Sequence, residues 1–380
     1  MTLFLFLKQI TDMFYSVRWI DYLMAAFLVV LILYQGWMIL PREGEGRIKY
    51  KPVLPDICII LLSLMTVVHI IVGGNFDIYQ NGKICTALMM YLLGRMAYKR
   101  AGENTPYLAL SSYIVIYTNV IIRFVNLGLE GFLGAGMSDN GMYYYGTDLA
   151  YAMLTGLIFV GMYGKNNILK FITIFAVCPF MIISSDAGVQ HILMWVVYVL
   201  LLLFMSERAV KRRRFTDFLL PFMILLMLAV IVILNIPAIT GDNDNILIDI
   251  FNHLKISTEN FVKRYAGWTD IMSEISGSDS ILLKVFGVGN ATDKDISSLY
   301  IGIIYSLGYA GLVMFFLFII SIAGYAVKIY DRRTYYVTVM LAVLFLGTGI
   351  NVFAIGFTQM SWFPLLYAGM VVSAANSTEK

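Results

Sequence analysis

Charged residues are scarce in this chain of 380 residues: Asp, Glu, Lys and Arg together make up 13% of it, whereas hydrophobic residues make up 60%. Soluble domains carry about 25% charged residues and about half apolar ones, so this composition excludes an ordinary soluble globular protein. The mean hydropathy of +0.79 agrees with this conclusion. A helix of about 20 apolar residues crosses a bilayer, and the chain contains many such runs. We therefore predict an all-α, polytopic integral membrane protein surrounded by a lipid bilayer.

Cysteine and histidine are also rare, with three of each. Cys58, Cys85 and Cys178 lie in apolar runs without the spacing of disulfides or metal sites, which predicts buried small side chains. No cluster of His, Asp and Glu has the spacing of metal ligands, so we expect neither a metal nor another cofactor. The chain lacks a basic patch with interleaved aromatic residues, which argues against nucleic acid as a partner.

Two further signals are missing. The segment "TLFLFL" at 2–7 has no preceding basic region and no small-residue cleavage site after it, so we expect no cleaved signal peptide. The first span, at about 19–40, would then direct insertion. The stretch "FGVGN" at 286–290 is not followed by Gly-Lys-Ser/Thr, which excludes a P-loop.

Apolar runs of span length recur along the chain, and we predict about eleven transmembrane helices, within a range of about 10 to 12. They cover residues 19–40, 54–73, 83–98, 107–127, 148–163, 168–184, 188–205, 216–236, 298–326, 334–350 and 358–375. Residues 1–18 fit either an interfacial helix or part of an additional span. The predicted organisation is an N-terminal membrane bundle (1–236), a large loop (237–297) and a C-terminal membrane bundle (298–380).

Basic residues are concentrated in alternate connections. They are Arg42, Arg47, Lys49, Lys51, Lys99, Arg100, Lys328, Arg332, Arg333 and those of "RAVKRRR" at 208–214. Cytoplasmic connections of membrane proteins carry the excess of Lys and Arg, so these connections and the C-terminus are predicted to be cytoplasmic. The loop 237–297 is then extracytoplasmic, and the same alternation puts the first 18 residues outside.

The loop 237–297 contains one strongly patterned segment, "NFVKRYAGWTDIMSEIS" at 260–276. Apolar residues recur in it at steps of three and four, the spacing of one helix face. They are Phe261, Tyr265, Trp268, Met272 and Ile275. Ser257, Thr258 or Asn260 could cap this helix. We predict that it lies along the outer membrane face and buries the stripe there.

Several cationic side chains could contact an anionic group. Arg123, in "NVIIRFVN", fits either an anchor for such a group or a side chain that snorkels to the lipid headgroups. Lys263 and Arg264 fit either phosphate binding or solvated charges, because guanidinium matches phosphate in a two-pronged geometry. Snorkelling is the expected behaviour of Arg95, near the cytoplasmic end of its span.

Candidates for proton transfer are fewer. His253 in the large loop could carry protons, and so could Asp186, Asp293 or Asp295, although each also fits a solvated surface residue. Two further histidines lie within predicted spans, where hydrogen-bonded packing is the expected role. These are His69 and His191.

Glycines form the strongest local pattern. Gly287 and Gly289 of "FGVGN" would permit a tight turn. Gly308 and Gly311 of "SLGYAGL" would allow another helix to approach closely inside the predicted span 298–326.

The order and spacing of these pieces resemble the O-antigen polymerase and ligase superfamily of bacterial membrane glycosyltransferases. The resemblance covers the layout of many spans with one large outer loop, and it implies a GT-C-like architecture. Its local matches are Arg264-x-x-x-Trp268, Phe286-Gly287-Val288-Gly289, Leu299-Tyr300 and Gly308-x-x-Gly311.

Two positions depart from that family. Its His-Asn or Asp-Asn pair falls on Ser297-Ser298 here, with Asp293 and Asp295 nearby. Its Ser-Arg at the seventh span is Ser185-Asp186. With these losses the chain resembles capsule or exopolysaccharide polymerases more than ligases.

The resemblance implies a repeat-unit polymerase in the bacterial plasma (inner) membrane. Its substrates would be oligosaccharides on undecaprenyl diphosphate at the outer face, and the growing glycan would move onto the next lipid-linked repeat. A chain-length regulator and a flippase would be associated partners. Arg264 would act on the diphosphate, and His253 or Asp295 would accept the proton of the acceptor hydroxyl. Residues expected to line the substrate are Arg123, by location alone, and Lys263, Tyr265, Trp268, Gly287 and Gly289.

Two other functions remain open. A ligase would transfer finished glycan to a lipid or surface acceptor. A transporter or flippase for lipid-linked oligosaccharides would be indicated by inverted repeats with broken helices and by charges within the spans. We see no such repeat and few such charges, and the large outer loop makes a purely structural membrane protein a weaker alternative.

Overall fold

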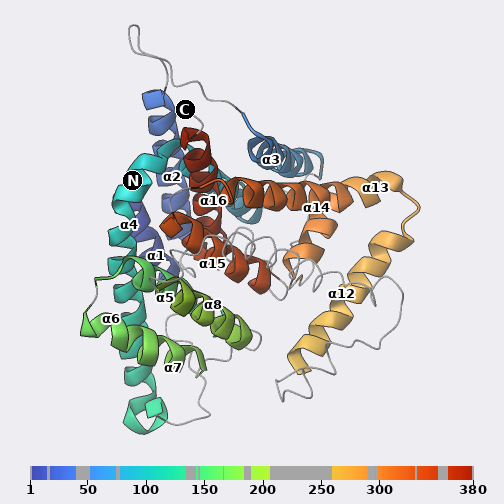
Figure 1. Cartoon of the computed structure of the whole chain (residues 1–380). Helices are drawn as coiled ribbons and strands as arrows, with labels where there is room; N and C mark the ends of the chain where they lie inside the picture. The colour runs from blue at the N-terminus through green and yellow to red at the C-terminus, as the bar shows by residue number, and fades with distance from the viewer. Residues whose placement is uncertain are drawn as a thin grey trace, which may run out of the picture.

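The computed structural model describes residues 2–14, 18–39, 52–73, 78–133, 143, 146–165, 167–183, 190–205, 259–289, 296, 298–329, 332–349 and 358–378. Within these ranges every regular element is helical and no strand occurs, which confirms the all-α prediction for this part of the chain. The elements, drawn in Figure 1, are α1 (Thr2–Thr11), the 3₁₀ turn η1 (Asp12–Phe14), α2 (Arg18–Ile39), α3 (Leu54–Gly73), α4 (Ile78–Leu133), α5 (Gly146–Tyr163), α6 (Ile168–Ile172), the π-helical turn η2 (Thr173–Val177), α7 (Cys178–Ile183), α8 (Gln190–Met205), α12 (Glu259–Gly277), α13 (Ile281–Phe286), α14 (Leu299–Ala326), α15 (Arg332–Thr348) and α16 (Thr358–Thr378).

Several of these helices are long and apolar enough to cross a membrane. Among the described residues they are Trp19–Trp37, Pro106–Gly128, Gly146–Tyr163 and Leu299–Ala326, and shorter apolar helices cover Leu54–His69, Ala87–Met96, Ile168–Ile182 and Leu193–Phe204. The last two predicted spans coincide with α15 and α16. The eighth predicted span, 216–236, and the basic segment 208–214 lie outside the described residues. The chain is therefore a helical membrane protein, whereas a total of eleven crossings stays a prediction.

Two predicted spans, 83–98 and 107–127, belong to one helix. α4 has 56 residues, which would measure about 84 Å if it were straight, against about 30 Å of bilayer core. Pro106 lies inside it, and proline removes a helical hydrogen bond and bends the axis. The two apolar parts of α4 are therefore still separate span candidates, joined by helix instead of the loop that we expected.

The crossing of α4 and α16 forms the centre of the bundle. A Cβ atom added to Gly94 would lie 2.1 Å from the carbonyl oxygen of Leu366, and one added to Gly369 would lie 2.1 Å from that of Tyr91. The two backbones are thus too close for any side chain at these glycines, which is how small residues let membrane helices pack. The Tyr91 ring also meets Phe318 of α14 edge to face, with centroids 5.4 Å apart.

The N-terminal helix α1 lies inside the bundle. Phe4, Leu5 and Lys8 are almost fully buried. Lys8 forms an ion pair with Asp12, and its ammonium nitrogen lies 3.8 Å from the ring centroid of Trp362 in α16. Buried charges require such partners. Within residues 2–14 the chain therefore packs against the other helices, and its position relative to the membrane stays a prediction.

The prediction that the cysteines are buried and unpaired is confirmed for two of the three. Cys58 and Cys178 are buried and form no disulfide. The side chain of Cys85 lies outside the described residues.

Candidate functional site

Helix α14 is broken at Gly308. The backbone there takes φ 67° and ψ −171°, a conformation that is essentially confined to glycine. The break divides α14 into two helical pieces, 299–307 and 309–326, and Figure 1 shows α13 against the end of the longer piece. The predicted close approach of another helix is confirmed at Gly308, where a Cβ would lie 2.2 Å from the carbonyl oxygen of Val285 in α13, but the sequence did not predict that the span is broken there.

The segment 286–289 fills the break with main-chain hydrogen bonds. In a regular helix the carbonyls of residues 305 and 306 accept from the amides of 309 and 310. Here the amide of Val288 donates to the Tyr305 carbonyl at 2.7 Å, and the amide of Gly289 donates to the Ser306 carbonyl at 3.1 Å. Buried backbone groups need such partners, so the incoming segment stabilises the irregular backbone of α14.

Gly287 and Gly308 each leave no room for a side chain on the other. Gly287 has φ 79° and ψ −178°, and a Cβ added to it would lie 2.5 Å from the Gly308 nitrogen. A Cβ added to Gly308 would lie 2.6 Å from the Gly287 nitrogen and 2.2 Å from the Val285 carbonyl oxygen. We call residues 286–289 and 305–308 the glycine platform. The predicted tight turn is confirmed, since Gly289 also has a positive φ of 84°.

His69 of α3 completes the platform. Its Nε2 lies 2.7 Å from the carbonyl oxygen of Phe286, a residue 217 positions away in the sequence. The ring also lies against Gly289, where an added Cβ would be 2.6 Å from Nδ1. The prediction that His69 is a hydrogen-bonded residue of its span is confirmed, and its partner is the glycine motif. The sequence held no signal for this partner beyond the position of His69 near the end of a span.

Helix α12 packs against α13 and α14 and carries the predicted apolar stripe. Trp268, Met272 and Ile275 are buried, whereas Asp270 and Ser273 are exposed, so the one-sided pattern is confirmed for the described members. The side chains of Phe261 and Tyr265 lie outside the described residues. Trp268, Met272 and Ile275 are covered by protein and not by lipid, so the expected burial of the stripe in the membrane is wrong for these three residues, and the position of α12 along the outer membrane face stays a prediction.

The predicted cations and bases are placed only in part. Lys263 and Arg264 lie on α12 one turn before Trp268, but their side chains lie outside the described residues. The predicted proton carriers in the loops, and the side chain of the histidine on α8, also lie outside the described residues. These residues are His253, Asp186, Asp293, Asp295 and His191.

Arg123 is fully buried on α4 and does not snorkel. Its guanidinium carbon lies 5.8 Å from the ring centroid of Phe180 in α7. Figure 1 shows α7 and α12 on opposite sides of the molecule. The structure therefore does not bring Arg123 to the glycine platform.

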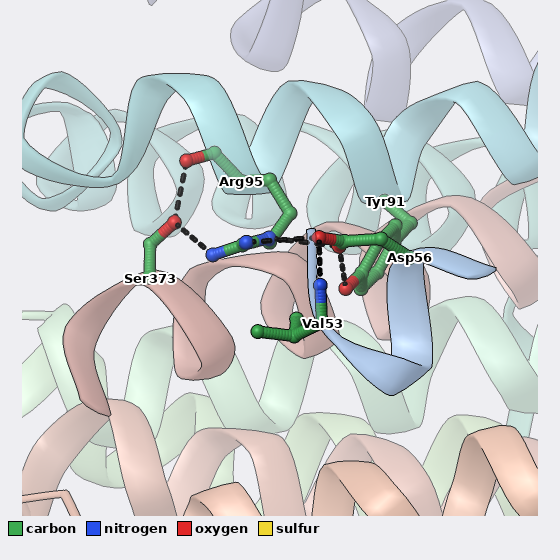
Figure 2. A network of polar contacts seen from close by, with 5 residues as sticks. All are labelled: Val53, Asp56, Tyr91, Arg95 and Ser373. Carbon is green, nitrogen blue, oxygen red and sulfur yellow. Dashed lines mark hydrogen bonds and ion pairs between the residues drawn. The ribbon is translucent and has the colours of Figure 1, made fainter. Parts of the chain in front are cut away.

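The opposite end of α3 carries an ion-pair network, shown in Figure 2. Arg95 of α4 donates from Nε to Asp56 Oδ1 at 2.9 Å and from Nη2 to Oδ2 at 3.0 Å. The Tyr91 hydroxyl donates to Oδ1 at 2.5 Å, and the Val53 amide donates to Oδ2 at 3.1 Å. Arg95 also donates to Ser373 of α16 at 3.3 Å. Arg95 is thus a structural ion-pair partner, and our expectation that it snorkels is wrong.

This network joins the start of α3, an interior turn of α4 and the last turns of α16, near connections that the distribution of basic residues assigns to one side of the membrane. Among the described residues, no group of three or more His, Cys, Asp or Glu side chains could hold a metal ion. Comparisons with protein-family models, with curated proteins and with solved structures found no match to this chain.

Proposed function

We propose that this chain is a polysaccharide repeat-unit polymerase of the bacterial plasma membrane, of the O-antigen, capsule or exopolysaccharide type. The glycine platform is the observation that carries the proposal. The two glycine motifs of the resemblance are separate in the sequence, yet Gly287 and Gly308 meet so closely that each requires the other to be glycine. About eleven crossings, a GT-C-like architecture and an extracytoplasmic position for 237–297 belong to the same proposal.

The proposed reaction suits a site at the outer membrane face. No nucleotide is supplied there, so the sugar donor must carry its own leaving group, which undecaprenyl diphosphate provides. Negative charge develops on the diphosphate as its bond to the sugar breaks, and a fixed cation stabilises that charge. Arg264 would supply this cation, because its guanidinium matches phosphate oxygens.

The anchoring of α12 supports this role for Arg264. Trp268 is 4% exposed and lies one helical turn after Arg264, on a helix that packs against α13 and α14. A buried aromatic anchor fixes the helix, and with it the side chains on the adjacent turn. Lys263 and Tyr265 would flank the same substrate. From the sequence, His253 and Asp295 are the candidates for the base that activates the acceptor hydroxyl.

The experiment compares polymerisation of purified lipid-linked repeats by the wild-type chain and by Arg264→Ala in liposomes. Loss of one group that stabilises developing charge typically lowers a rate by about 100-fold or more, so we expect that loss with normal insertion. Lys165→Ala, which removes an exposed cation between α5 and α6, should keep the wild-type rate.

The outcomes separate the alternatives. Full activity of Arg264→Ala would remove the role of this residue. A wild-type chain that attaches finished glycan to another acceptor, without extending repeats, would favour a ligase. Passage of labelled substrate across liposomes without any transfer would favour a flippase.

A further inference from the structure

We propose that His69 of α3 is the base of the glycan transfer, with Nδ1 accepting the proton of the acceptor hydroxyl. This inference rests on the proposed function and replaces His253 and Asp295 in that role. It would place the catalytic base on a transmembrane helix and the leaving-group cation on the large loop.

The hydrogen bond to Phe286 assigns the protonation of the imidazole. A carbonyl oxygen only accepts, so the Nε2 that lies 2.7 Å from it carries a hydrogen. In the neutral ring the other nitrogen, Nδ1, then holds a lone pair. A hydrogen bond from one ring nitrogen to a backbone carbonyl is a common way to select the tautomer of a functional histidine. Within the described part of the chain, Nδ1 accepts no hydrogen bond.

Nδ1 faces the backbone of Gly289. A side chain on Gly289 would begin 2.6 Å from Nδ1, so glycine at this position lets the imidazole lie against the motif. His69 is half-buried and not sealed inside the bundle. The base therefore lies directly against the motif Phe286-Gly287-Val288-Gly289.

One serine of the pair that stands at the family's His-Asn or Asp-Asn position, Ser298, is used for structure. Ser298 is 3% exposed, and its hydroxyl donates to the Gly349 carbonyl at 3.4 Å. Ser298 is also the residue that precedes the first turn of α14. Ser298 is therefore held by structural contacts, and among the described side chains His69 is an ionisable one that hydrogen-bonds the motif.

The proposed step balances atoms and charge. The acceptor hydroxyl oxygen bonds to the anomeric carbon of the donor sugar while the bond from that carbon to the diphosphate oxygen breaks. Undecaprenyl diphosphate leaves with the electron pair, and the hydroxyl proton moves to Nδ1. The resulting imidazolium remains bonded through Nε2–H to the Phe286 carbonyl, which stabilises its positive charge, and Nδ1 then releases the proton to water.

His69→Gln separates proton transfer from positioning. The glutamine amide nitrogen can occupy the place of Nε2 and donate to the Phe286 carbonyl, but it has no basic atom. General-base catalysis contributes about 10²- to 10⁴-fold. We therefore expect His69→Gln to lower the initial polymerisation rate about 100-fold or more, with unchanged insertion and thermal unfolding. His191→Gln is the matched control on α8, which packs against α5, α7 and α15, and should keep the rate.

A second variant tests the same step without relying on glutamine. In His69→Gly, added imidazole should restore part of the rate, whereas pyrrole, which donates N–H but has no basic nitrogen, should not. Equal rescue by pyrrole, no rescue by imidazole, or a His69→Gln variant as fast as wild type would each overturn the base role and leave the polymerase proposal standing. A wild-type chain that extends no repeats would overturn both.

Discussion

The two ends of α3 are joined to neighbouring helices by different kinds of hydrogen bond. At Asp56 the connection to α4 and α16 is made mainly by side chains, and the carboxylate meets Arg95, Tyr91 and the Val53 amide. At His69 the imidazole bonds the Phe286 carbonyl at the end of α13, and the residues that follow bond α14 through backbone amides and carbonyls. Both ends place polar groups where apolar helices pack together.

The difference separates a structural joint from a site. A buried ion pair stabilises only if its remaining hydrogen-bonding capacity is also used, and Asp56, with an exposed fraction of 0%, accepts four hydrogen bonds from three residues. Such a joint has no capacity left for a ligand. In the glycine platform the carbonyls of Tyr305 and Ser306 accept from backbone amides, and His69 stays half-buried, as the proposed base role requires.

Replacing Gly308 by alanine should have the largest effect. The new Cβ would lie 2.2 Å from the Val285 carbonyl oxygen, and the φ of 67° is strained for any other residue. Such strain costs about 1–3 kcal/mol before the clash is counted. We expect segment 286–289 to leave the break and polymerisation to fall below detection in the liposome assay.

Gly324→Ala is the control on the same helix. No atom lies within 4 Å of its added Cβ, and alanine favours helix over glycine by about 1 kcal/mol. This variant should match or exceed the wild-type stability and keep the rate. A Gly308→Ala variant with normal activity would show that the platform geometry does not matter for function.

Replacing Arg95 by alanine should disrupt the ion pair with Asp56 and leave the glycine platform intact. Asp56 would keep its burial but lose its cation, and removing one partner of a buried ion pair costs about 3–5 kcal/mol. We expect a clearly lower midpoint of thermal unfolding in detergent, while the polymerisation rate per folded molecule stays near wild type. The double variant Asp56→Asn with Arg95→Met should recover part of the stability. A normal unfolding midpoint with lost activity would reverse the roles of the two ends.

Most helix positions follow from the sequence because the signal is local. Runs of span length predict helix whatever their neighbours are, and the described residues of the predicted spans are helical, although α4 contains two of these spans and α14 is broken at Gly308. Local patterns also predict the buried side of α12 at Trp268 and the turn at Gly287. The burial of α1 was harder to predict, although Lys8 and Asp12 are spaced to pair on one helix face, because the partner Trp362 lies far along the chain.

The platform could not be derived in the same way. A glycine such as Gly308 inside an apolar run fits both a packed helix and a broken one, and the hydrogen bonds that decide between them come from residues 288 and 289. His69 and Phe286 are 217 residues apart, so no local spacing relates them. The ion pair of Arg95 could not be predicted for the same reason, because its partner Asp56 lies in the first turn of a different helix.

The smallest effect is expected for Ser373, which contacts the Asp56–Arg95 ion pair only through Arg95. Its hydroxyl accepts from Arg95 Nη1 at 3.3 Å and donates to the Arg95 carbonyl. Ser373→Ala should cost about 0.5–1.5 kcal/mol, the usual net value of a hydrogen bond, because Arg95 keeps both bonds to Asp56. Ser276→Ala on α12 removes an exposed hydroxyl bonded only within its own helix and should leave the unfolding midpoint unchanged. If Ser373→Ala destabilises the chain as much as Arg95→Ala, the joint is held by the contact of α4 with α16, and the ion pair contributes little.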